Sequence, residues 1–172
     1  MITVVTGPKG SGKSTYLINH AEEIKAKGIM VGGVISRGFW KNNEREYYDA
    51  VDPASGISQL LASKNTPSNT ENLNILHRGP WYFHRQTFAM FNERINQFIK
   101  NYLSGNKQAV LYIDEIGEIE LANEGWDIGN FIKLAPPELN FMLGVRQSIL
   151  DRLGPVWGIE GRIIELPLFK PV

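Results

Sequence analysis

The chain of 172 residues contains no cysteine. This absence excludes disulfide bonds, thiol catalysis and cysteine-ligated metal sites. An excess of charge of either sign is also missing, because 18 basic residues balance 18 acidic ones. A neutral composition argues against a protein that binds nucleic acids or membrane surfaces through a broad charged face. We therefore expect neither a nucleic acid nor a membrane as its partner.

Long hydrophobic runs are absent as well. No segment of the chain approaches the roughly 18 consecutive apolar residues that a membrane span requires. The first residues also lack the charged region, apolar stretch and cleavage site of a signal peptide. We therefore expect a cytoplasmic protein. Its length and its hydrophobic fraction of 42% fit one domain, residues 1–172, with a packed core.

The clearest positive signal is the N-terminal string MITVVTGPKGSGKST. Its β-branched start predicts a short buried strand, and residues 7–14 match the pattern G-x-x-x-x-G-K-[ST]. Glycines let successive backbone N–H groups surround a phosphate. In such a loop, Lys13 reaches the β- and γ-phosphate oxygens and the Ser14 hydroxyl can bind Mg²⁺. The expected nucleotide-binding residues are Gly7, Pro8, Lys9, Gly10, Ser11, Gly12, Lys13, Ser14 and Thr15.

A second group of candidate residues follows the apolar run 109–113, AVLYI. Such a run is typical of a strand buried on both faces, and open parallel sheets bind ligands beyond the carboxyl ends of their strands. Asp114 and Glu115 come next in the chain. We expect Asp114, together with Ser14, to hold Mg²⁺ as a cofactor, and Glu115 to orient or deprotonate an attacking water.

Phosphoryl transfer also requires positive charge beside the γ-phosphate. Besides Lys13, we favour Arg146 as a catalytic residue, because it follows the predicted strand 139–145 and would emerge at the same sheet edge. Arg37 and Arg152 are alternatives, and Gln147 is a possible polar contact to the γ-phosphate.

Predicted strands alternate with predicted helices along the whole chain, which indicates an α/β fold of three layers with a mostly parallel central sheet. The second strand, 29–35, contains Gly32 and Gly33, which suggest a close backbone approach or a bulge. Short strands at 45–51 and 57–62 predict a small antiparallel insertion after it. Trp81 and Tyr82, before the helix predicted at 84–103, would either stack on a nucleobase or cover the sheet edge.

Residues 113–121, IDEIGEIEL, carry a specific resemblance when taken together with the loop at 7–14. The chain resembles the THEP1-type family of small nucleoside-triphosphatases, whose second motif reads DEIGKMEL. The Val31-Gly32-Gly33 string and the Gly79-x-Trp81 element also agree with the pattern of this family. The resemblance implies a phosphate-loop fold and a Mg²⁺-dependent hydrolysis of a nucleoside triphosphate to the diphosphate and phosphate. By the same resemblance, residues 7–14 cradle the phosphates, Asp114 assists the metal and Glu115 activates water.

The chain departs from the family pattern at two places. Glu118 stands where the family has a lysine, and residues 35–39, ISRGF, replace its T-E-E-V-R string. The C-terminal part is also shorter. Both nucleotide motifs are intact.

Hydrolysis of a nucleoside triphosphate is therefore the favoured function, with two alternatives. The first is a kinase that passes the γ-phosphate to a small molecule; such enzymes usually need an arginine-rich lid, and the eight arginines here are scattered. The second is a nucleotide-switched binding module, with aromatic residues at 39–40 and 81–83 as its partner surface.

Overall fold

The computed structural model describes residues 1–42, 44–65, 74–105 and 108–167. Within these ranges, nine strands form one sheet in the order β5-β6-β4-β3-β2-β7-β8-β1-β9. The strands are β1 (Ile2–Thr6), β2 (Met30–Lys41), β3 (Glu44–Val51), β4 (Ser58–Ser63), β5 (Ile75–Arg78), β6 (Trp81–His84), β7 (Ala109–Ile116), β8 (Asn140–Val145) and β9 (Arg162–Glu165). The helices are α1 (Lys13–Ala26), α2 (Arg85–Leu103), α3 (Glu118–Leu121), α4 (Ile128–Leu134), the 3₁₀ helix η1 (Gln147–Arg152) and α5 (Leu153–Trp157).

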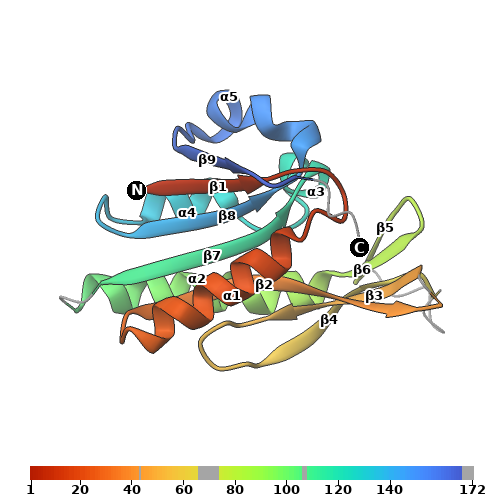
Figure 1. Ribbon diagram of the computed structural model, residues 1–172, viewed down its shortest axis with the longest axis horizontal. Helices are drawn as coiled ribbons and strands as arrows, with labels where there is room; N and C mark the ends of the chain where they lie inside the picture. Colours follow the sequence, from red (N-terminus) through yellow and green to blue (C-terminus); the bar gives the residue numbers. More distant parts are fainter. Residues whose placement is uncertain (43, 66–73, 106–107, 168–172) are drawn as a thin grey trace.

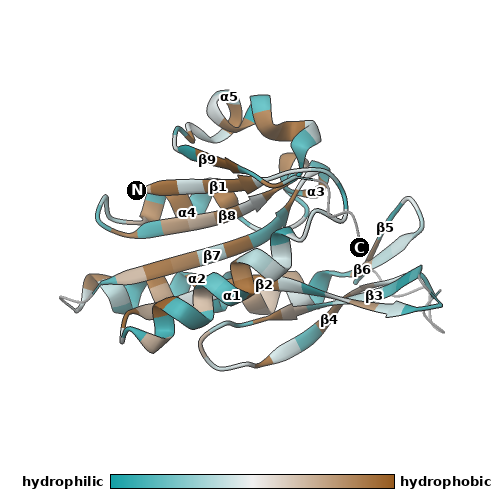
Figure 2. Ribbon diagram, in the orientation of Figure 1, coloured by the Kyte–Doolittle hydropathy of each residue, from teal (hydrophilic) through white to brown (hydrophobic). Residues whose placement is uncertain are grey.

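Half of the sheet is a parallel core in the order β2-β7-β8-β1-β9. Strands β1, β7 and β8 lie inside this core, where both faces of the sheet are covered. Nearly all of their residues are buried, and Figure 2 shows them as predominantly hydrophobic ribbons. Burial on both faces accounts for the near-continuous apolar runs by which the sequence predicted these strands.

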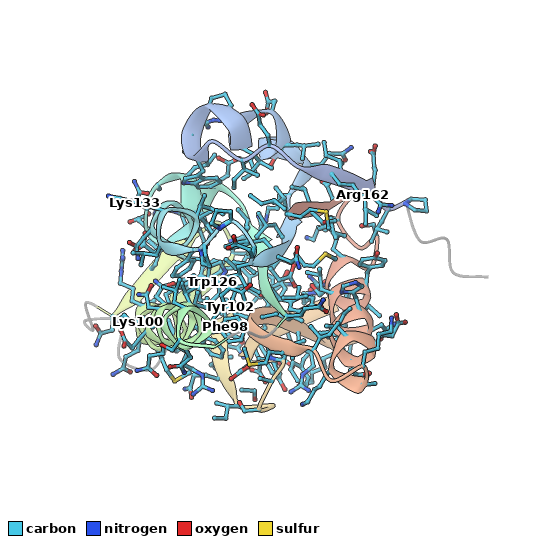
Figure 3. The ribbon with its side chains drawn as sticks, turned by 90° about the vertical axis from the view of Figure 1, so that its left-hand side faces the viewer. Phe98, Lys100, Tyr102, Trp126, Lys133 and Arg162 are labelled. Carbon is cyan, nitrogen blue, oxygen red and sulfur yellow. The ribbon has the colours of Figure 1, made fainter. Side chains whose placement is uncertain are left out.

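Helices cover the two faces of the core, with α1 on one side of the sheet and α2 and α4 on the other (Figure 3). On the first side, Leu17 and Ala21 of α1 pack with Val110 of β7. On the second side, Phe91 and Ile95 of α2 belong to the larger apolar cluster. The core is therefore layered as helix, sheet and helix, as the alternation of elements predicted.

The other half of the sheet is an antiparallel extension, formed by the second part of β2 with β3, β4, β6 and β5 (Figure 1). The sheet is therefore mixed, and the prediction of a mostly parallel sheet was wrong. Short strands were expected at 45–51 and 57–62, and β3 and β4 confirm them. The extension is larger than predicted because β5 and β6 join it and β2 continues to Lys41, so that one long strand belongs to both halves.

The glycine pair in β2 allows the close approaches that the sequence suggested. A Cβ at Gly32 would overlap the ring of Phe98 in α2. Gly33 has a φ of +112°, and a Cβ there would overlap the carbonyl oxygen of Tyr112 in β7. The pairing of β2 with β7 keeps its register through both residues, so the pair marks close packing and not a bulge.

Most other predicted elements are confirmed with small shifts at their ends. The helix predicted at 84–103 starts at Arg85, and the strand predicted at 109–113 continues to Ile116. Residues 63–72 are polar and contain Pro67, which predicts an exposed loop; residues 66–72 of this stretch lie outside the described residues. In the described ranges, no helix combines the length and the apolar character needed to cross a membrane.

Replacement of Gly33 by alanine should lower the free energy of unfolding by at least about 3 kcal/mol, because it adds backbone strain to a clash with a strand backbone. Gly105→Ala is the matched control, because a Cβ there would meet only the Asn101 carbonyl oxygen at 3.7 Å. Urea unfolding of both variants measures the difference. Equal stability of the two variants would contradict the packing described for β2 and β7.

Candidate active site

The loop between β1 and α1 holds the lysine of the phosphate-loop pattern close to its own backbone. Lys13 Nζ donates hydrogen bonds to the carbonyl oxygens of Gly7 at 3.0 Å and Pro8 at 3.2 Å. The first turn of α1 closes with the Tyr16 N–H donating to the Gly12 oxygen at 2.8 Å. The Lys13 side chain therefore folds back onto the loop that precedes it.

Asp114 of β7 lies buried beneath this loop, with a relative exposure of 1%. Its carboxylate accepts a hydrogen bond from the Ser14 hydroxyl of α1. It also accepts from the backbone N–H of Ser36 in β2 at 3.1 Å and from that of Glu115 at 2.8 Å. A Cβ at Gly144 of β8 would overlap a carboxylate oxygen of Asp114, so glycine is required there to leave room for the acid.

The ionisation of Asp114 reflects this burial. Removal from water, followed by the negative charge of Glu115, raises the pKa of Asp114 to about 7. The hydrogen bonds from Ser14 and from the backbone oppose this rise, because they stabilise the ionised form. A nearby cation would favour the ionised carboxylate further.

Glu115 occupies a bulge at the end of β7. Two residues, Asp114 and Glu115, separate Ile113 from Ile116, whereas one residue separates their partners in β8. Glu115 has a φ of +59°, an uncommon value for a residue with a side chain. The bulge interrupts the alternation of the strand, and the Glu115 side chain lines the cavity above the phosphate loop.

Arg146 meets Glu115 across the ends of two neighbouring strands. Its guanidinium lies 3.2 Å from the Glu115 carboxylate, with Nε and Nη2 both donating to the same oxygen. A Cβ at Gly117 would come within 2.8 Å of Arg146 Cδ, so the glycine of the DEIG string makes room for the arginine. The two residues that the sequence singled out as base and cation are thus in direct contact.

A cavity of about 530 Å³ joins these parts. The phosphate loop forms one wall, and β2, β3 and β6 form the opposite wall. The residues proposed from sequence that line it are Gly7, Pro8, Lys9, Gly10, Gly12, Lys13, Ser14, Thr15, Glu115 and Arg146. Ser11 and Asp114 are buried.

The other residues considered for contact with the γ-phosphate, two arginines and Gln147, differ in their positions. Arg37 lines the cavity but pairs with Asp49 at 3.8 Å. Gln147 lines it too, and its amide donates to Glu165 at 3.0 Å. Arg152 is not among the lining residues. Arg146 is therefore the arginine of these three that contacts Glu115.

The two aromatic residues before α2 are placed differently. Trp81 lines the cavity and packs against Tyr48, with ring centroids 4.8 Å apart. Tyr82 stacks on His77 at 4.6 Å. Of the two, Trp81 is the one that faces the cavity.

Two supporting residues were missed by the sequence analysis, Glu120 and Trp126. The buried Glu120 carboxylate accepts hydrogen bonds from the backbone N–H of Gly117 at 2.8 Å and of Trp126 at 3.3 Å. Trp126, labelled in Figure 3, donates its indole N–H to the backbone oxygen of Asp114 at 2.9 Å. Together they fix the backbone on both sides of Glu115. The Gly-x-x-Glu spacing at 117–120 resembles a helix capping box and was the available sequence signal.

A second cavity of about 370 Å³ adjoins the first, and Glu115 lines both. The two cavities share five lining residues: Lys9, Tyr48, Trp81, Glu115 and Arg146. Aromatic and aliphatic side chains line much of the remainder: Leu61, Phe83, Phe88 and Trp126.

The donor groups at the phosphate loop fit a magnesium ion. In the part of the chain that the structure describes, no group of three or more His, Asp or Glu residues could hold a metal ion. The Ser14 hydroxyl and the Asp114 carboxylate, which are hydrogen-bonded to each other, are the hard oxygen ligands that Mg²⁺ prefers. Mg²⁺ is usually bound by one or two protein oxygens together with substrate phosphates.

Comparisons with known proteins agree with this architecture. A family model described as NTPase matches residues 2–128. The nucleoside-triphosphatase THEP1 of Thermococcus kodakarensis is 25% identical over 159 residues, which cover 88% of this chain and 79% of that protein. THEP1 of Methanothermobacter thermautotrophicus is 38% identical over 66 residues, and the match covers 38% of each chain.

Two solved structures share the fold. The solution structure of a human cancer-related nucleoside triphosphatase superposes with a TM-score of 0.66 at 20% identity, covering 98% of this chain and 88% of that one. The crystal structure of THEP1 from the hyperthermophile Aquifex aeolicus gives 0.64 at 20% identity, covering 97% and 90%. At this identity the likeness concerns the α/β fold with its mixed sheet.

Glu120→Ala should lower the free energy of unfolding by about 2–4 kcal/mol, because it leaves two buried N–H groups without an acceptor. Glu120→Gln, the matched control, keeps an acceptor oxygen and should lose less. Denaturant unfolding measures both. If the alanine variant proved as stable as the glutamine variant, the supporting role of Glu120 would be wrong.

A comparison of the wild type with Glu120→Gln gives a pH test. Burial raises the pKa of Glu120 to about 7 from its ordinary value of 4.5. An acid with a raised folded-state pKa favours folding most below pH 4.5, and this contribution is lost as the pH rises through 7. Without divalent cations, the stability of the wild type should therefore fall more steeply over this window than that of Glu120→Gln. Parallel pH profiles would contradict the assignment.

Proposed function

The chain belongs to the NTPase family and is a nucleoside-triphosphatase, and we propose that it hydrolyses its substrate with Mg²⁺ at the cavity above the phosphate loop. The observation that carries this proposal is the meeting of Ser14, Asp114, Glu115 and Arg146 beside that loop. We further propose that residues 1–172 form a single phosphate-loop domain of three layers.

The phosphate loop binds the triphosphate through its backbone N–H groups and through the N-terminal end of α1, as is usual for this pattern. The residues assigned to this role are Gly7, Pro8, Lys9, Gly10, Ser11, Gly12, Lys13, Ser14 and Thr15. Lys13 exchanges its contacts with the loop carbonyls for β- and γ-phosphate oxygens.

Ser14 and Asp114 are the residues that would hold the metal ion. When bound, Mg²⁺ would neutralise charge on the β- and γ-phosphate oxygens. The hydroxyl of Ser14 and the carboxylate of Asp114 are pre-positioned for this task by their mutual hydrogen bond and by the Ser36 N–H. The ionised form of Asp114 is the one that this role requires.

Glu115 orients a water molecule and accepts its proton. The water oxygen forms a bond to the γ-phosphorus, the bond from that phosphorus to the β-phosphate oxygen breaks, and the nucleoside diphosphate leaves with the electron pair. Arg146 supplies positive charge at the transferring phosphoryl group and holds the Glu115 carboxylate in place through the 3.2 Å ion pair. The strained backbone of Glu115 aims the side chain at the cavity.

Replacement of Glu115 by glutamine should lower phosphate release by at least about 100-fold, because an amide cannot take the proton of the attacking water. Nucleotide affinity should stay within about threefold. Phosphate release from ATP, GTP, CTP and UTP, with and without Mg²⁺, tests the whole proposal, and omission of the metal should abolish it. Exposed Glu138→Gln serves as the matched control. Undiminished release by Glu115→Gln would refute the assignment of Glu115.

The second cavity favours one further candidate function, the transfer of the γ-phosphate to a small-molecule hydroxyl. Its 370 Å³ lies within the size range of ligand pockets, and Glu115 borders it as well as the nucleotide cavity. The test adds nucleosides and other aromatic alcohols to the ATP reaction and compares the diphosphate formed with the free phosphate. A phosphorylated product equal to the missing phosphate would establish transfer. Equal amounts of diphosphate and free phosphate throughout would support hydrolysis alone.

A further inference from the structure

Three arginines line the nucleotide cavity, and Arg45 of β3 differs from the other two in its partners. Arg37 pairs with Asp49 and Arg146 pairs with Glu115. Among the residues with described positions, Arg45 forms no ion pair with a carboxylate. The acids on either side of it in the sequence, Glu44 and Glu46, pair with lysines instead.

Aromatic rings and one hydrogen bond hold the Arg45 guanidinium in place. Its Cζ lies 4.7 Å from the ring centroid of Trp40 and 4.7 Å from that of Tyr48. Its Nη1 donates to the Tyr48 hydroxyl at 2.6 Å. A Cβ at Gly38 would come within 2.7 Å of Arg45 Nε, so the neighbouring strand leaves room for this side chain. Stacking of this kind fixes the planar group before a ligand arrives.

The hydrogen-bonding capacity of this guanidinium is not fully used. Arg45 Nε is buried and has no hydrogen-bond partner within the described part of the chain. Buried donors normally have partners, and a partly desolvated cation needs an anion nearby. In a cavity formed by a phosphate loop, a phosphate is the anion that meets this need.

The position of Arg45 indicates which phosphate of the nucleotide it would bind. Its partner Tyr48 lines both cavities together with Glu115. Burial and then the negative charge of Glu115 raise the pKa of Tyr48, so the hydroxyl lies within electrostatic reach of that carboxylate. Glu115 marks the end of the cavity where the attacking water is placed, which is the γ-phosphate end.

We propose that Arg45 binds the γ-phosphate oxygens of the substrate, so that the antiparallel extension distinguishes a triphosphate from a diphosphate. This inference rests on the function proposed for the phosphate loop. Arg45 contributes positive charge from β3, opposite the loop, while Arg146 contributes from the end of β8. The antiparallel extension therefore contributes a binding residue to the site.

The test measures the affinity of Arg45→Met for a non-hydrolysable triphosphate analogue, AMP-PNP, and for ADP, with Mg²⁺ and by calorimetry. Methionine keeps much of the apolar stem and removes the charge. The Kd for AMP-PNP should rise at least about tenfold, the Kd for ADP should stay within about twofold, and phosphate release should fall by at least about 100-fold. Arg162→Met is the control, because Arg162 is exposed on β9 (Figure 3), lines neither cavity and should leave all three values unchanged.

Two outcomes would overturn the proposal: an unchanged Kd for both nucleotides, or an equal loss of affinity for both, which a merely structural role would give. Arg45→Lys keeps the charge without the planar group and should show an intermediate preference. It also keeps the test valid if Arg45→Met fails to fold. Wild-type protein that binds neither nucleotide, or Lys13→Ala that binds both normally, would instead count against the function proposed for the phosphate loop.

Discussion

The buried carboxylate of Asp114 is the constraint on which the rest of the site depends. A charge-bearing group in the interior is costly unless hydrogen bonds surround it, and here its donors come from three elements: α1, β2 and β7. Each donor is in place only when the phosphate loop, the second strand and the acidic strand have their correct relative positions. The space that Gly144 leaves in β8 adds a fourth element. Correct packing of the core therefore also brings the Ser14 hydroxyl to the Asp114 carboxylate.

Backbone strain is found at the same strand end, at Glu115, which directly follows Asp114. Glu115 has an unfavourable backbone conformation, and the structure compensates for it with contacts on both sides. Trp126 holds the backbone before it, Glu120 holds the backbone after it, and Arg146 binds its side chain. The DEIG-x-x-E string thus contains residues of the candidate site and residues that hold the backbone around them. Its first glutamate lines the cavity and its aspartate is buried beside Ser14, whereas its glycine and last glutamate support the strand end.

Both halves of the mixed sheet contribute residues to the site. The parallel core presents the phosphate loop and the acids at one edge, as parallel sheets commonly do. The antiparallel extension continues from the same β2 strand, and its residues Trp40, Arg45 and Tyr48 form the wall opposite the loop. A short loop after β2 would remove these lining residues and leave the cavity open on that side. The length of β2 is the feature that couples the two halves.

The sequence by itself determined the phosphate-loop pattern, the acidic pair after the buried strand 109–113 and most of the strands and helices of the parallel core. These features are encoded by residues that are neighbours in the chain, through glycine spacing and apolar runs. Only the tertiary structure decided that Arg146 contacts Glu115, that Glu120 and Trp126 support the strand end, and that Arg45 reaches the cavity. The tertiary structure also decided how many strands join the antiparallel extension, and therefore that the sheet is mixed and not mostly parallel. These features depend on which strands pair and in which register, and short strands such as β5 and β6 carry too little local signal to fix their partners.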